Sequence, residues 1–100
     1  MREQMKNLDE ILSRLRQEKS FLAKNYHVAQ LGIFGSTSRG EATPQSDIDI
    51  LVEFSAPIGL DIVDLAEHLE DVLGVCVDLV PRDAIKARYW KVIQPEVRYV

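Results

Sequence analysis

The sequence predicts a single small domain of the α/β (α+β) class, in which helices pack on a mixed β-sheet. Its 100 residues suit one domain spanning 1–100, because autonomous domains usually run from about 50 to 250 residues. Hydrophobic residues make up 46% and charged residues 28% of the chain, a balance typical of globular proteins. Helical and strand periodicities alternate along the chain, and that order favours helices that cover a sheet.

The first half of the chain is expected to hold one helix and one strand. Apolar residues at helical spacing in LDEILSRL predict a helix over 8–24, which Asn7 or Asp9 caps. The segment HVAQLGIFG, 27–35, is rich in β-branched and aromatic residues and predicts a short strand that ends on a glycine. Residues 36–46 are small and polar, with a glycine and a proline among them, and are expected to form a loop.

The second half is expected to hold two more strands and two more helices. Residues 47–54, DIDILVEF, alternate in polarity and predict a strand with one buried face. An amphipathic helix over 60–73 should end at Gly74. VCVDLV, 75–80, predicts a further strand, and 83–94 a weaker helix that a proline ends. The expected order is therefore helix, strand, strand, helix, strand, helix.

Charge is unevenly distributed along the chain. The formal net charge is −4, which argues against direct nucleic-acid binding because phosphate neutralisation needs a basic surface. Residues 53–78 contain seven acidic residues and no Lys or Arg, whereas residues 81–100 contain five basic residues and two acidic ones. Solvated faces are the ordinary explanation, and a surface for a partner is the alternative.

The sequence also indicates the cellular compartment in which the protein is expected. No apolar run approaches the roughly 20 residues of a membrane span, and the charged N-terminus lacks the apolar centre of a signal peptide. Cys76 is the only cysteine, so we expect a reducing cytoplasm and, given its apolar neighbours, a buried and inert thiol.

A glycine-serine pair and three aspartates carry the chemistry. Gly35 lacks a Cβ, so a bulky anion can approach the backbone. Ser36 can offer a hydroxyl and can begin a helical turn whose free N–H groups point at a phosphate. Asp47 and Asp49 are two residues apart on a strand, so their carboxylates project from one face, roughly 6–7 Å apart at Cα. Mg²⁺ relieves the repulsion between such carboxylates, because it prefers carboxylate and phosphate oxygens. Asp78 on the next strand would supply a third carboxylate.

Together these residues suit the displacement of a nucleoside triphosphate. Two magnesium ions held by the aspartates could clamp the triphosphate for in-line attack at phosphorus. Asp78 would ligate metal, or would take the proton of an acceptor hydroxyl. This interpretation requires Asp78 to lie on the same sheet face as Asp47 and Asp49.

The segment GSTSRGEATPQSDIDILVEF closely resembles the signature of the DNA-polymerase-β-like nucleotidyltransferase superfamily, and in particular of its minimal members. LGIFGS, SRGEA, SDIDILVEF and GVCVDLV follow in the order of that family, so the resemblance covers nearly the whole chain. Thr37 and Ser38 depart from the Arg-Ala often found at those positions. The resemblance implies the nucleotidyltransferase fold, with ATP as substrate and Mg²⁺ held by the three aspartates.

The minimal members resemble antitoxins that are paired with HEPN-type RNase toxins and adenylylate a tyrosine on the toxin. The resemblance therefore implies a HEPN toxin as partner and acceptor. Two alternatives are a non-catalytic antitoxin that masks the toxin surface, and a nucleotidyltransferase that acts on a small molecule.

Other residues have weaker assignments. Arg39 is expected either to contact the triphosphate or to pair within the loop, and Ser46 either to contact the nucleotide or to stabilise the turn. His68 is expected on a solvated face, among acidic residues. Tyr89 and Trp90 are expected to pack against the sheet or a partner rather than to stack on a base.

Overall fold

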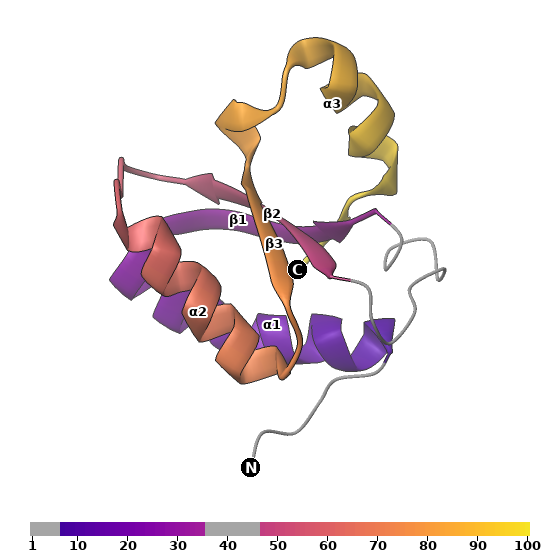
Figure 1. The fold of residues 1–100 in the computed structure, drawn as a ribbon. Helices are drawn as coiled ribbons and strands as arrows, with labels where there is room; N and C mark the ends of the chain where they lie inside the picture. The colour runs from indigo at the N-terminus through magenta and orange to yellow at the C-terminus, as the bar shows by residue number, and fades with distance from the viewer. Residues whose placement is uncertain (1–6, 36–46) are drawn as a thin grey trace.

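The structure is a computed structural model that describes residues 7–35 and 47–100. In these residues a mixed sheet of four strands, in the order β3-β2-β1-β4, has α1 and α2 on one face and α3 on the other side (Figure 1). The expected fold class is confirmed. The elements are α1 (Leu8–Tyr26), β1 (Val28–Phe34), β2 (Ile48–Phe54), α2 (Asp61–Leu73), β3 (Val77–Pro81), α3 (Ala87–Ile93) and β4 (Arg98–Tyr99), with short 3₁₀ helices η1 (Arg82–Ala84) and η2 (Gln94–Glu96) on either side of α3.

A side-chain cap begins helix α1, and a residue in the left-handed conformation ends it. The Asn7 side chain accepts a hydrogen bond from the backbone N–H of Glu10 at 2.8 Å, as expected of an N-cap. The helix continues two residues past the predicted end, to Tyr26, and stops where His27 adopts the left-handed conformation with φ 56°. The carbonyl of His27 then accepts the N–H of Ser55 at 2.8 Å. This bond ties the end of α1 to the end of β2.

Strand pairing produces a mixed sheet. β1 pairs antiparallel with both β2 and β4, and β2 pairs parallel with β3. The parallel pair needs a crossover, and α2 supplies it. Gly74 ends α2 in the left-handed conformation, as the sequence predicts.

The core lies between the sheet and helices α1 and α2. Leucines on one side of each helix meet isoleucines and valines of β1 and β2. Within the part of the chain that the structure describes, no helix is long and apolar enough to span a membrane. The fully buried core side chains include Leu15, Leu22, Ile33, Ile50, Val52, Leu65, Leu69 and Leu73.

Strand β2 is covered on both faces, whereas its alternation predicts one buried face. Leu51 points away from the core of α1 and α2, yet it is only 1% exposed. β3 and β4 lie at opposite edges of the sheet, residues 82–97 connect them on the side away from α1 and α2 (Figure 1), and η1 contacts β2. We call residues 82–97 the C-terminal crossover. Leu51 is buried on the side of the sheet where this segment lies, and no local pattern in 47–54 predicts such a long-range cover.

The C-terminal crossover also differs from the single helix predicted over 83–94. Lys86 has the extended angles φ −67° and ψ 148°, so η1 and α3 are separate. α3 ends at Ile93, and η2 contains the proline expected to end the helix. The two-residue strand β4 follows, pairs with Gly32 and Ile33, and has no counterpart in the sequence prediction. It is too short to leave a strand periodicity.

Two expectations about single side chains are wrong. Cys76 is exposed rather than buried, because it precedes β3 instead of lying within it. His68 does not stand on a fully solvated face: its ring stacks on Phe21 with centroids 4.8 Å apart, and its Nε2 lies 3.4 Å from a Glu18 carboxylate oxygen. It therefore links α2 to α1.

The core analysis yields a stability test on α2 and its N-terminus. We expect Leu69→Ala to lower the free energy of unfolding by about 2–5 kcal/mol, because Leu69 is fully buried and its truncation leaves a cavity. Leu60→Ala is the matched control, since Leu60 is 87% exposed and its loss should change stability by less than about 0.5 kcal/mol. Equilibrium urea unfolding measures both. Equal losses would contradict the assigned core.

Candidate active site

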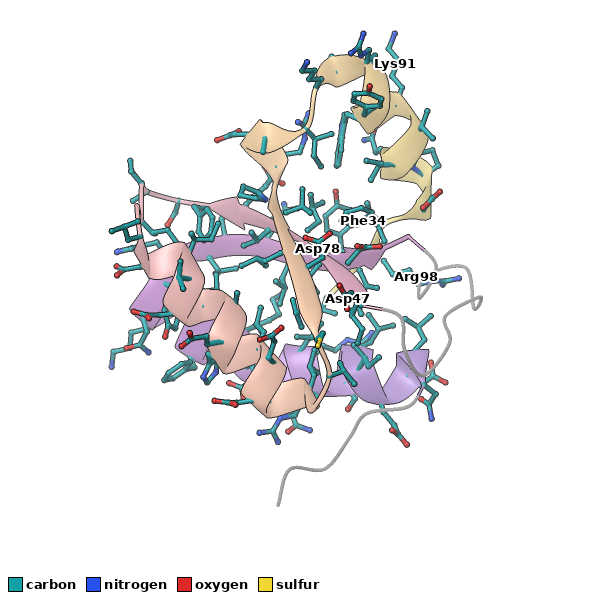
Figure 2. The ribbon with its side chains drawn as sticks, viewed as in Figure 1. Phe34, Asp47, Asp78, Lys91 and Arg98 are labelled. Carbon is teal, nitrogen blue, oxygen red and sulfur yellow. The ribbon has the colours of Figure 1, made fainter. Side chains whose placement is uncertain are left out.

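The carboxylates of the expected site share one face of the sheet. Asp49 on β2 is the direct register partner of Asp78 on β3, and partners in adjacent strands project from the same face. Asp47 precedes β2 and lies two residues before Asp49, which extends the same alternation. Figure 2 shows Asp47 at the start of β2 and Asp78 on β3. The register thus places Asp49 and Asp78 on a common face, as the sequence interpretation requires, and the strand period extends that face to Asp47. We call it the carboxylate face.

Gly35 adjoins this face because of the pairing of β1 with β2. Phe34, the last residue of β1, is the register partner of Asp49, so the chain turns away beside that carboxylate. Gly35 has φ +76°, a left-handed conformation that favours glycine. A Cβ at Gly35 would overlap the carboxylate of Asp49. The backbone angle therefore favours glycine here, and a larger residue would force the Asp49 carboxylate to move.

Two other carboxylates hold the backbone beside the aspartates. The N–H of Gly35 donates to Oε2 of Glu96 at 3.2 Å, and the N–H of Val77 donates to Oε2 of Glu70 at 3.0 Å. Val77 immediately precedes Asp78. Glu70 lies only seven residues before Val77, but Glu96 comes from η2, 61 residues after Gly35. The sequence carries no local signal that pairs them, and sequence reasoning missed Glu96.

The aspartates differ in their access to solvent. Asp47 and Asp78 are exposed, and Asp49 is half-buried between its neighbouring strands. Ser36, Arg39 and Ser46, the other expected nucleotide contacts, lie outside the described residues. An approaching substrate can therefore reach at least two of the carboxylates directly.

The carboxylate oxygens of these aspartates are ligands suited to a hard cation. Carboxylate oxygens are the ligands that Mg²⁺ prefers, and Asp49 and Asp78 occupy adjacent strands at one level of the sheet. As their side chains stand, no three His, Cys, Asp or Glu residues within 7–35 and 47–100 are gathered closely enough to hold a metal ion. An aspartate can rotate about χ1 and χ2, so the backbone register, rather than the present rotamers, makes the aspartates suitable ligands.

The basic end of the chain forms contacts within the C-terminal crossover. The guanidinium of Arg82 lies 4.0 Å from the centre of the Trp90 ring, a cation–π contact that joins η1 to α3. Trp90 thus packs inside this segment, while Tyr89 is 53% exposed. Lys91 stands at the outer end of α3, away from Asp47 and Asp78 (Figure 2).

Comparison with known proteins identifies close relatives in sequence. The chain is 43% identical over 97 residues to a protein of Thermococcus cleftensis named protein adenylyltransferase MntA, covering 96% of this chain and 98% of that one. It is 46% identical over 98 residues to a Methanocaldococcus jannaschii protein named as a candidate protein adenylyltransferase, covering 96% of this chain and all of that one.

Solved structures show the same fold. A protein described as a candidate minimal nucleotidyltransferase aligns with a TM-score of 0.80 and 32% identity over 93% of this chain and 95% of its own. A chain of a toxin–antitoxin crystal structure with AMP-PNP aligns with a TM-score of 0.70 and 24% identity, over 87% of this chain and 69% of its own. A family model described as nucleotidyltransferase domain matches residues 8–100. Because that match spans nearly the whole chain, this protein belongs to the nucleotidyltransferase domain family.

Proposed function

We propose that this nucleotidyltransferase moves AMP from ATP to a hydroxyl group of a partner toxin and thereby acts as its antitoxin. The observation that carries the proposal is the register of Asp49 with Asp78, which puts two carboxylates side by side next to the Gly35 turn. Relatives named protein adenylyltransferase support the reaction. A structural neighbour from a toxin–antitoxin complex with AMP-PNP supports the substrate and the kind of partner.

Each residue has a proposed role in the transfer. The acceptor oxygen attacks the α-phosphorus of ATP, the bond from that phosphorus to the β-phosphate oxygen breaks, and pyrophosphate leaves. Asp78 orients the acceptor hydroxyl and takes its proton. Gly35 and Ser36 bind the triphosphate, and Arg39 and Ser46 are further proposed nucleotide contacts. Asp47, Asp49 and Asp78 are the proposed ligands of two Mg²⁺ ions, which when bound neutralise the triphosphate charge and align it.

We further propose a HEPN-type RNase as the toxin and a tyrosine as the acceptor, as the family resemblance implies. The exposure of Asp47 and Asp78 supports an acceptor carried by a whole protein, because a side chain on a protein surface can reach them. A cytoplasmic location is part of the proposal, since the single exposed thiol of Cys76 suits a reducing compartment.

A second candidate is an antitoxin that masks the toxin without catalysis. It is favoured by the observation that the described side chains gather no three-residue metal site. The two functions differ in what the aspartates do. In the masking protein they are surface charges, and in the transferase they are required for each turnover.

An aspartate substitution separates the two candidates. We expect Asp49→Asn to slow AMP transfer to the toxin roughly 10³-fold or more, because a proposed metal ligand loses its charge. Asp64→Asn removes the same charge from an exposed position on α2 and should leave transfer unchanged. The measurement is intact mass spectrometry of the toxin after incubation with ATP and Mg²⁺. If the protein with both Asp47→Asn and Asp49→Asn still protects cells at normal abundance, masking is the function.

Two matched glycine substitutions test the contact between Gly35 and Asp49. Gly35→Ala and Gly59→Ala both place a side chain at a positive φ, +76° and +55°, but only Gly35 has a neighbour within 4 Å of the added Cβ. Both should lose about 1–2 kcal/mol of stability through backbone strain. We expect Gly35→Ala alone to abolish transfer, because its methyl group displaces the Asp49 carboxylate. Thermal unfolding and the transfer rate measure the two effects, and equal activity in both variants would contradict the assigned turn.

A further inference from the structure

The C-terminal crossover contacts the candidate site through a carboxylate of its own, that of Glu96. This segment leaves β3 at one edge of the sheet, passes over the carboxylate face and arrives at β4 on the other edge. Helix α3 within it buries none of its residues. Val97, just before β4, packs over Gly32. Glu96 is the residue before Val97, so the docking of β4 on β1 fixes where the Glu96 side chain begins.

Glu96 contacts the Gly35 turn. Its Oε2 accepts the N–H of Gly35 at 3.2 Å in a partly buried position. On its other side Gly35 lies directly against the carboxylate of Asp49. Glu96, the Gly35 backbone and Asp49 therefore form a continuous row of contacts from the crossover to the centre of the site.

We propose that Glu96 is a positioning residue for nucleotidyl transfer, which holds the Gly35 turn in place against Asp49. Glycine has the widest range of backbone conformations, so a turn built on it needs an external constraint to keep one geometry. A side-chain oxygen that accepts the Gly35 N–H, as Glu96 Oε2 does at 3.2 Å, supplies such a constraint. Small displacements of reacting groups cost large factors in rate. The proposal rests on the proposed function, because its effect is on the rate of that reaction.

The role requires that the side chain reach Gly35 and accept its N–H; it does not require a negative charge. Glutamine has the same length as glutamate and keeps a carbonyl acceptor. Aspartate keeps the charge but is one methylene shorter and falls short of the N–H. A carboxylate that instead bound metal, or competed with phosphate for the N–H, would give the opposite order. Glu96→Gln, Glu96→Asp and Glu96→Ala thus separate the explanations.

The experiment measures the kcat of AMP transfer to the toxin for these three variants and the wild type. We expect Glu96→Gln to stay within about threefold of the wild type, and Glu96→Asp and Glu96→Ala to fall about tenfold or more with little change in KM for ATP. Glu67→Gln, at an exposed position on α2, controls for the loss of a charge. The proposal is overturned if Glu96→Asp is as active as the wild type, if Glu96→Gln is as slow as Glu96→Ala, or if Glu96→Ala lowers KM instead of kcat.

Amide hydrogen exchange at Gly35, followed by NMR, gives a readout that does not depend on activity. Exchange should be slow in the wild type and in Glu96→Gln, and about tenfold or more faster in Glu96→Asp and Glu96→Ala. Equal exchange in all four proteins would overturn the proposal even where folding is intact. A wild-type protein that transfers no AMP would contradict the proposed function, and the Gly35 exchange rates would still decide whether Glu96 holds the turn.

Discussion

The register of β2 against its two neighbours is the constraint on which the site depends. Asp49 faces Phe34 on one side and Asp78 on the other, and a slip of one residue would turn it into the core. The alternating isoleucines and valine of β2 prevent that slip, because they are buried against α1 and α2. The hydrophobic core thus sets the position of the carboxylates, although it lies on the opposite face of the sheet.

The residues of the candidate site destabilise the sheet on which they lie. Asp49 and Asp78 are directly opposed like charges, an arrangement that destabilises a strand pair. Gly35 adds a conformation that only glycine adopts readily. The burial of leucines from both helices offsets these costs. The opposed carboxylates therefore lie where the other face of the same strands is packed against both helices.

The C-terminal crossover joins parts of the sheet that the first half of the chain leaves separate. It leads to β4 at the free edge of β1 and brings Glu96 to Gly35. Its own helix contributes nothing to the core. Within the crossover, Arg82 and Trp90 are in cation–π contact, and Glu96 is its contact with the Gly35 turn.

Local sequence determined α1, β2 and α2 through their amphipathic repeats, and β1 through its β-branched and aromatic residues. It also predicted that Asp47 and Asp49 project from one face, because residues two apart on a strand point to the same side. The tertiary structure alone decided that Asp78 joins them, that the last predicted helix breaks into η1, α3 and η2, and that β4 completes the sheet. It alone exposed Cys76 and paired Glu96 with Gly35. These features arise from contacts between distant segments, which leave no periodicity in the sequence, because their energy comes from the packing of the whole fold.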